Sequence, residues 1–298
     1  MGYPPGIPGA RPLQISPPSS LVHSLRHRGR ITGPATFAPL YGGRTNQVWR
    51  ILGQKEDLVL KLYRATQSNP LFRNDPAREI QCLQALADTG FVPNLRDSGQ
   101  FEQAYWVLYD HAPGATWREN PSLAANVLRH LHTTAVTLNA PKGCNGSVEI
   151  ADHAETILGQ CTSEDRARLI ALRPSNAVPP SPEVRLIHGD PVAGNILCQG
   201  DAAILIDWQC PLLGDPCEDL ALFLSPAMQF LYRGQTLTTD EIEHFITAYG
   251  CPDTSDRLRQ LLPWYHWRMS AYCLWRAENG TDDYARAMEL ELESLVTM

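Results

Sequence analysis

One stretch constrains the fold more than any other: "LIHGDPVAGNILCQGDAAILIDWQ", residues 186–209. It contains two short apolar runs joined by Gly200-Asp201, a residue pair typical of a two-residue hairpin turn. The runs are short enough to be buried strands, so we predict an antiparallel hairpin. With the turn at this position, Asn195 is expected to lie opposite Ile206.

That register gathers polar side chains at the open end of the hairpin. Asp207 returns beside Asn195, and Asp190 lies on the loop just before the first strand. Carboxylate and amide oxygens are the ligands that Mg²⁺ prefers, so Asn195 and Asp207 are predicted metal ligands. Asp190 is predicted to be the catalytic base that accepts a hydroxyl proton, and His188 to brace the loop by hydrogen bonding. This division of roles is typical of phosphoryl transfer.

The alternative is that each aspartate merely caps a turn, and for either residue alone that explanation is equally good. The joint spacing H-G-D-x-x-x-x-N, followed after one hairpin by I-D, is far more specific. It favours a functional site.

Composition narrows the classes of protein. The chain has 298 residues, 43% of them apolar, which is enough for one large domain or two lobes. A net charge of −7 argues against nucleic-acid binding and against an anionic membrane surface. No apolar run approaches the roughly 20 residues of a spanning helix. Eight cysteines without a C-x-x-C pair indicate reduced thiols of a cytoplasmic protein.

The order of patterns predicts an α+β protein. Residues 1–30 are rich in Pro, Gly and Ser and are expected to form a flexible tail. Residues 31–110 carry strand patterns and one helix that begins at Asp75-Pro76, which predicts a small antiparallel β lobe. Residues 111–298 are mainly helical around the hairpin, and they are expected to form a larger catalytic and substrate-binding lobe.

The motifs "HGDPVAGNIL" and "LIDW" resemble the signature of the aminoglycoside phosphotransferase and choline kinase superfamily, whose members are relatives of the protein kinases. The resemblance covers nearly the whole chain after about residue 35. It implies a two-lobed protein-kinase-like fold that binds ATP between the lobes, with Mg²⁺ as cofactor.

The small lobe carries a second set of candidates. In "LYGGRTNQVWRI" a turn at Gly42-Gly43 lies between two strands, which lets the backbone approach phosphates. Most Gly-Gly pairs are ordinary hairpin turns, so this signal alone is weak. The segment also resembles the G-G-x-T-N of choline and ethanolamine kinases, which adds Thr45 and Asn46 to the predicted nucleotide-binding residues.

Lys61 in "LVLKLY" is a cation inside an apolar strand and resembles the β3 lysine of kinases. Glu79, early in the next helix, is its predicted partner, and together they would reach the ATP phosphates. The alternative is a lysine that keeps an edge strand soluble. "HGD" in place of H-R-D, and "DWQ" without a following A-P-E segment, favour a small-molecule acceptor over a polypeptide.

The C-terminal region suggests which acceptor. Trp264 and Trp267 are three residues apart and share one face of a helix, while Tyr284 lies on the next helix. Such rings form either a cage for a quaternary ammonium group or part of the helical core. Choline kinases carry a similar W-x-x-W and a later Tyr that line the choline pocket. The resemblance therefore implies choline or a related amino alcohol as substrate.

Two departures lower the negative charge expected near a cationic substrate: Gln209 and Pro226 stand where many choline kinases have glutamate. A kinase of an aminoglycoside, thiamine or another small metabolite is therefore an alternative. Alternatives of another class are a metal-dependent hydrolase that uses His188, Asp190 and Asp207, and a catalytically silent binding module. The sequence carries no signal for an oligomeric state.

Overall fold

The computed structural model describes residues 16–40, 45–64 and 69–297. By its contacts the chain divides into two compact units. Unit 1 comprises Met1–Gln67 and Pro93–His111, and unit 2 comprises Ser68–Val92 and Ala112–Met298.

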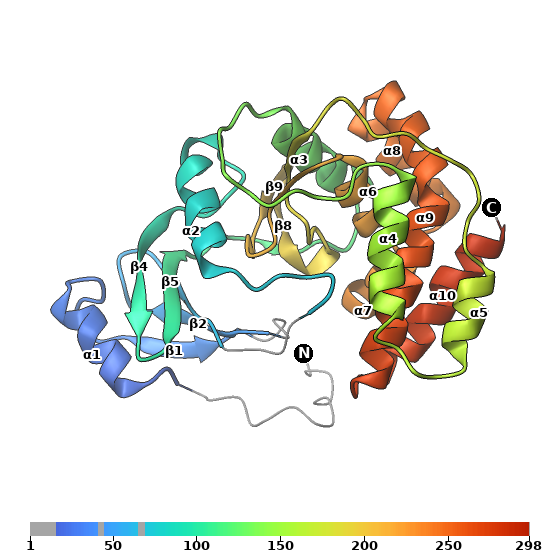
Figure 1. Cartoon of the computed structure of the whole chain (residues 1–298). Coiled ribbons are helices and arrows are strands. Elements are labelled where there is room, and N and C mark those ends of the chain that lie inside the picture. The colour runs from blue at the N-terminus through green and yellow to red at the C-terminus, as the bar shows by residue number, and fades with distance from the viewer. Residues whose placement is uncertain (1–15, 41–44, 65–68, 298) are drawn as a thin grey trace. The chain divides into compact units, whose positions relative to one another are not determined.

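Unit 1 is built on an antiparallel sheet with the strand order β1-β2-β3-β5-β4 (Figure 1). The strands are β1 (Thr36–Pro39), β2 (Gln47–Leu52), β3 (Leu58–Leu62), β4 (Leu95–Phe101) and β5 (Ala104–Asp110). In β2 the side chains alternate between buried and half-buried, whereas every residue of β3 is buried. A strand in the middle of a sheet whose side chains are all buried is covered on both faces, and here the buried set includes Lys61.

The prediction of a flexible tail over residues 1–30 is wrong for its second half, which contains the helix α1 (Ser19–His27). Its Leu21 and Leu25 lie four residues apart on one face, and both are buried in the core of unit 1 with Trp49. The sequence prediction relied on the Pro-, Gly- and Ser-rich composition of residues 1–30 and gave no weight to the helical spacing of these two leucines. Residues 1–15 lie outside the described residues.

Unit 2 holds short strands and most of the helices. The strands are β6 (Ala115–Thr116), β7 (Arg185–Ile187), β8 (Ile196–Gln199), β9 (Ala202–Leu205) and β10 (Leu212–Gly214). The helices are α2 (Pro76–Ala85), α3 (Pro121–Thr133), α4 (Ser147–Leu158), α5 (Asp165–Ala171), α6 (Cys217–Leu224), α7 (Pro226–Arg233), α8 (Thr239–Tyr249), α9 (Pro252–Glu278) and α10 (Asp283–Thr297), with 3-10 turns η1 (Ala87–Thr89) and η2 (Ala193–Asn195).

The helix α2 begins as its sequence predicts. Pro76 occupies the first helical position, and the Asp75 carboxylate accepts hydrogen bonds from the backbone N–H groups of Ala77 and Arg78. The sequence predicted that this helix belongs to the β lobe of residues 31–110. Instead, α2 and the segment before it belong to unit 2.

Hydrogen bonds explain why this segment joins unit 2. Asn69 Nδ2 donates to Tyr272 Oη at 3.0 Å, His153 Nε2 donates to Pro70 O at 2.9 Å, and Cys210 Sγ donates to Arg73 O at 2.9 Å. These contacts join residues distant in sequence, so no local pattern signals them.

The long helix α9 forms the centre of the helical part of unit 2, with α4, α6 and α10 packed against it (Figure 1). Nearly every side chain between Leu261 and Trp275 is buried. A helix buried around most of its circumference is a core helix. Among the described residues, no helix is both long enough and apolar enough to cross a membrane. All eight cysteines lie within the described ranges, and each is a free thiol.

Candidate active site

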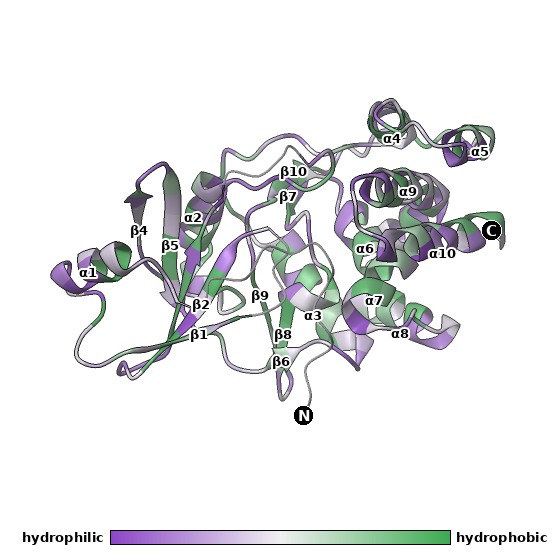
Figure 2. Cartoon of the chain, turned by 90° about the horizontal axis from the view of Figure 1, so that it is seen from below, coloured by the Kyte–Doolittle hydropathy of each residue, from purple (hydrophilic) through white to green (hydrophobic). Residues whose placement is uncertain are grey.

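The predicted hairpin is confirmed with its register. β8 pairs antiparallel with β9, with Leu197 opposite Ile204, and Ile206 N donates to Asn195 O at 3.0 Å just beyond the strands. Gly200 in the turn has a φ of 59°, which suits glycine. Both strands are coloured hydrophobic over most of their length (Figure 2), in line with a buried support for the polar residues at their open end.

Asp190 and Asn195 meet at that open end. Asn195 Nδ2 donates to the Asp190 backbone oxygen at 2.9 Å and to its carboxylate Oδ2 at 3.2 Å. Both bonds use the amide nitrogen, so the amide oxygen Oδ1 is the atom of Asn195 that is chemically suited to ligate a cation. The geometry places the Asp190 carboxylate, the predicted base, next to a predicted metal ligand.

Asp207, the second candidate ligand, has an unusual backbone. Its φ of 67° lies in the left-handed region, which costs a non-glycine residue roughly 1–2 kcal/mol. The neighbouring Trp208 is fully buried, and its indole N–H donates to Leu205 O at 2.9 Å. Such strain persists where surrounding structure enforces it, and it is concentrated at functional sites.

His188 is buried and holds the loop from within. Its Nε2 lies 3.0 Å from Ile206 O, and Asp190 N donates to its Nδ1 at 3.2 Å. A carbonyl only accepts and an amide N–H only donates, so these partners define a neutral ring with the proton on Nε2. The ring also packs on Trp208 with centroids 4.5 Å apart. This is the geometry that a bracing role requires.

Gly189 cannot be replaced without moving the loop. Its φ is 78°, and a Cβ at this position would collide with the carbonyl oxygen of Cys210. The glycine of "HGD" is therefore needed for the close approach between the Asp190 loop and the segment that follows Asp207.

Asp219 on α6 is a residue of the site that the sequence motifs did not assign. Its carboxylate is fully buried and accepts the backbone N–H groups of His188 at 2.7 Å and Gly189 at 2.8 Å. The run "CEDLALFL" reads as an apolar helix, and nothing local distinguishes this aspartate from an exposed one.

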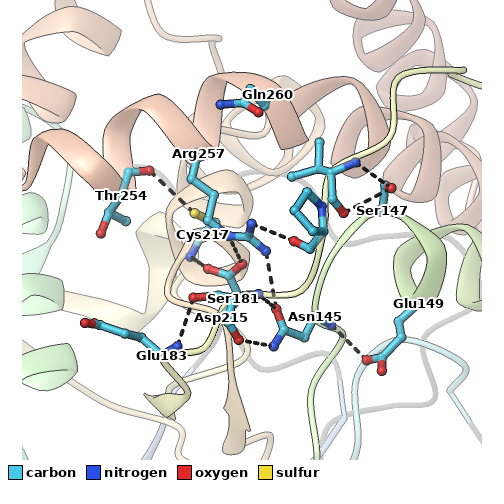
Figure 3. Close-up of polar contacts among 12 residues, drawn as sticks. Asn145, Ser147, Glu149, Ser181, Glu183, Asp215, Cys217, Thr254, Arg257 and Gln260 are labelled. Atoms are coloured by element: carbon cyan, nitrogen blue, oxygen red, sulfur yellow. Dashed lines mark hydrogen bonds and ion pairs between the residues drawn. The ribbon is translucent and has the colours of Figure 1, made fainter.

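The start of α6 is anchored by a further carboxylate, Asp215 (Figure 3). It accepts from Cys217 N at 3.0 Å and from Arg257 Nε at 2.7 Å, and Arg257 Nη2 also donates to Asn145 Oδ1 at 3.3 Å. The Asn145 side chain in turn exchanges hydrogen bonds with the backbone of Ser181. The network joins α6 to α9 and to the Pro-rich loop before β7.

The predicted phosphate-binding residues lie in unit 1, and only some are described. Gly42 and Gly43 fall outside the described residues. Thr45 is half-buried, and the buried Asn46 accepts the backbone N–H of Arg64 through Oδ1 at 3.3 Å.

Lys61 is 2% exposed on β3, and its ammonium lies 4.8 Å from the centre of the Tyr63 ring. Its strand pairs on both sides, with β2 and β5, so it is not an edge-strand lysine. Glu79 is 1% exposed in the first turn of α2, in unit 2. The pairing of Lys61 with Glu79 stays a prediction.

The tryptophans of the predicted cage are buried against the protein itself. Trp264 and Trp267 meet edge to face with centroids 6.2 Å apart, and their indole N–H groups donate to the backbone oxygens of Asn176 and Leu169. The Arg173 guanidinium lies 5.2 Å from the centre of the Trp264 ring. A cation of the protein itself therefore already lies over the Trp264 ring.

Tyr284 lies on α10 and packs against another part of α9. Its ring meets Tyr272 edge to face at 5.9 Å, and the Arg276 guanidinium lies 5.0 Å from its centre. Tyr272 follows Trp264 by eight residues, about 12 Å along the helix. In the described part of the chain, therefore, these aromatic rings are held in two separate clusters and not in the single open cage that the sequence predicts.

The two departures from choline kinases are also buried. Gln209 is 5% exposed, and its backbone oxygen accepts Asp75 N at 3.4 Å. Pro226 is the first residue of α7, where a missing N–H has no consequence for the helix.

No group of three or more His, Cys, Asp or Glu side chains suited to a metal is present among the described residues.

Comparison with known proteins identifies the fold. Two matching solved structures are of aminoglycoside phosphotransferases: a thermostable mutant of APH(4)-Ia in complex with AMP-PNP and hygromycin B (TM-score 0.64, 16% identity, 91% of this chain and 97% of that chain covered), and the spectinomycin phosphotransferase APH(9)-Ia with ADP and spectinomycin (0.63, 15%, 95% and 95%). A choline/ethanolamine kinase family protein from Mesorhizobium loti also matches (0.61, 18%, 91% and 94%). A search of curated protein sequences finds no match.

These likenesses confirm the predicted kinase-like fold, with a β lobe and a helical lobe. A family model described as the phosphotransferase enzyme family matches residues 36–261, which is well over half of the chain and includes the hairpin with Asp190, Asn195 and Asp207. The chain therefore belongs to the phosphotransferase enzyme family.

Proposed function

We propose that this protein transfers the γ-phosphoryl group of ATP to the hydroxyl of a small molecule. The observation that carries the proposal is the junction of Asp190 with Asn195, where the amide nitrogen of Asn195 donates to the Asp190 carboxylate at 3.2 Å. The hydroxyl oxygen of the acceptor attacks the γ-phosphorus while Asp190 accepts the hydroxyl proton, and ADP leaves.

Asn195 and Asp207 supply a hard amide oxygen and a carboxylate, a donor set that fits Mg²⁺. When bound, Mg²⁺ neutralises charge on the phosphate oxygens. A test of this role is Asp207→Asn, which removes the anionic ligand and keeps the size of the side chain. The variant is expected to lose turnover, together with the Mg²⁺ dependence of nucleotide binding measured by calorimetry. If nucleotide affinity is indifferent to Mg²⁺ in both proteins, the metal role is wrong.

Lys61 is proposed to contact the α- and β-phosphates, oriented by Glu79, with the Gly42-Gly43 turn, Thr45 and Asn46 completing the nucleotide site. A lysine that is 2% exposed on an apolar strand is costly to bury, which supports a functional reason for it. The complexes of structural relatives with AMP-PNP and with ADP support the same use of nucleotide.

The acceptor is proposed to be a small hydroxyl compound. The sequence prediction of choline depended on open faces of Trp264 and Trp267, and Arg173 covers the Trp264 ring. Support for choline from these tryptophans is therefore weaker than the sequence alone implied. The likeness to aminoglycoside enzymes and to a choline/ethanolamine kinase family protein keeps both kinds of acceptor in the proposal.

The experiment is ADP release from Mg·ATP by the purified chain, with choline, ethanolamine, thiamine, hygromycin B and spectinomycin as acceptors. One acceptor is expected to stimulate ADP release in the wild type and not in Asp190→Ala. Phosphate release that needs Asp190 but no acceptor would indicate a hydrolase. Nucleotide binding without turnover, unchanged in Asp190→Ala, would indicate a silent binding module.

A further inference from the structure

The helix α7 lies beside the segment that carries Asp190 and Asn195. A Cβ on Gly194, in the turn η2, would come within 2.9 Å of the Tyr232 ring of α7. Gly194 directly precedes Asn195, whose amide donates to the Asp190 carboxylate. The Tyr232 ring therefore contacts the segment that holds the proposed base, and the side chains next to Tyr232 are candidates for contact with the acceptor.

A group of aromatic side chains continues from Tyr232 to the end of α9. The Tyr272 ring meets Tyr284 edge to face at 5.9 Å and Phe72 edge to face at 5.1 Å. Burial raises the pKa of the Tyr272 hydroxyl well above its usual range, and the neighbouring Tyr284 and Tyr232 raise it further. The three tyrosines thus come together from α7, α9 and α10, which pack against one another in unit 2 (Figure 1).

A cation, Arg276, lies in this aromatic group. Its guanidinium is 5.0 Å from the centre of the Tyr284 ring, and its charge opposes the rise in the pKa of Tyr272. The Arg276 Nε atom is buried and has no hydrogen-bond partner among the residues that the structure describes. The other arginines of α9 and α10 each pair with a carboxylate: Arg257, Arg259, Arg268 and Arg286. Arg276 therefore keeps hydrogen-bonding capacity that these arginines spend within the protein.

The chemistry of Arg276 favours an anionic ligand. A guanidinium presents its N–H groups in a planar fork that matches the oxygens of a carboxylate or a phosphate. An ammonium group of an acceptor would instead be repelled by this charge. The Tyr284 ring offers little to such an ammonium group either, because Arg276 already lies over it.

We propose that Arg276 binds an anionic group of the acceptor, so that the substrate is a small hydroxyl compound that carries a carboxylate or a phosphate. Tyr232 lines the site between that group and the Asp190 segment. This inference rests on the proposed function and narrows its acceptor. The cationic acceptors, choline among them, are the competing class.

Acceptors that differ mainly in charge test the proposal. Glycerol, glycerate and glycerol 3-phosphate share a primary hydroxyl and differ in one terminal group, and serine differs from ethanolamine by a carboxylate. For the wild type we expect kcat/KM, measured by ADP release, to be about 10- to 100-fold higher for an anionic member of a set than for its partner, the effect of a hydrogen bond to a charged group. Comparison of glycerate with glycerol 3-phosphate shows which anion Arg276 takes.

Arg276→Gln keeps a polar side chain and removes the charge. It should reduce the preference for the anionic acceptor to within about threefold of the neutral one, mainly through a higher KM for the anionic acceptor. Arg276→Lys, which keeps the charge without the planar fork, should lie between Gln and wild type. Arg173→Gln is the matched control, because Arg173 also lies over an aromatic ring, that of Trp264, in the other cluster. Its acceptor preference should match the wild type.

Equal kcat/KM within each set, a preference for choline or ethanolamine, or an unchanged preference in Arg276→Gln would overturn the proposal. If thermal unfolding shows that Arg276→Gln does not fold, the wild-type preference and Arg276→Lys decide. If no acceptor is phosphorylated, the proposed function fails in this assay. Calorimetric titration of glycerate and glycerol 3-phosphate into the protein with Mg·AMP-PNP then still decides the anion site: binding that is lost in Arg276→Lys or Arg276→Gln supports it, and absence of binding to the wild type overturns it.

Discussion

Two regions of unit 2 differ in how the backbone and the packing hold the side chains that the sequence predicts to be functional. In residues 188–207, polar groups are fixed by backbone conformations that few residues adopt, a positive φ at Gly189 and another at Asp207. On α9, Trp264 and Trp267 sit on regular helix and pack against neighbouring segments. The strained backbone at Asp207 supports a functional role for the first region, whereas regular structure with satisfied N–H groups is typical of a core.

Substitutions in the two regions are therefore expected to affect different properties of the protein. A strained loop holds groups for chemistry, so its loss should affect turnover more than folding. A packed ring pair holds helices together, so its loss should affect folding more than turnover.

Asp190→Ala should give the largest effect. The loss of a positioned proton acceptor is expected to lower kcat by about 10²–10⁴-fold, with thermal stability close to wild type. Steady-state ADP release and thermal unfolding measure the two quantities. Asp201→Ala, in the exposed turn of the same hairpin, is the control. Activity of Asp190→Ala within a few-fold of wild type would remove the catalytic assignment.

Gly189→Ala should come next and is best compared with Gly200→Ala. Both glycines have positive φ, so each substitution carries the roughly 1–2 kcal/mol of a left-handed alanine. Only Gly189 also meets a backbone oxygen, that of Cys210, while Gly200 has open space around its Cα. Gly189→Ala is expected to lose about 100-fold in kcat through displacement of Asp190. Equal kinetic losses in the two variants would show that the close contact is unimportant.

Trp267→Ala should reverse the pattern. The side chain is 1% exposed, and its truncation is expected to lower the free energy of unfolding by about 3–5 kcal/mol. Because the ring is core, kcat and KM of the remaining folded protein should change little. Urea unfolding and kinetics below the transition measure this, with Tyr105→Ala, at an exposed ring of unit 1, as control. A raised KM for the acceptor with unchanged stability would restore the cage prediction.

Arg173→Gln should have the smallest effect. The guanidinium is about half exposed, and it contacts Trp264 and the Glu155 carboxylate. Its loss is expected to cost about 0.5–1 kcal/mol of stability, the range for an exposed cation–π contact. The variant also tests whether the ring pair is an acceptor site closed by Arg173. In that case choline would bind the variant more tightly than the wild type in a calorimetric titration.

The hairpin shows how much of the site local sequence predicts. Its strands, turn and register follow from apolar runs and Gly200-Asp201, and the structure has that register. Asp190, Asn195 and Asp207 lie within eighteen residues of one another, so one turn is enough to bring their segments together. The start of α2 was predicted for the same reason, since its cap and Pro76 act within one helical turn.

Other features depend on contacts between residues distant in sequence, and the sequence alone did not determine them. Asp219 and His132 meet from α6 and α3 across 87 residues, and Arg173 covers Trp264 from a loop that no helical pattern predicts. A pattern of helix spacing states which residues share a face but not what covers that face. The phosphotransferase motif and the hairpin that carries it could be predicted from the sequence, because both depend on residues close together in the chain. The aspartate that holds the loop and the arginine that covers the tryptophan are known only from the structure, because packing between distant segments sets which side chains are buried and paired.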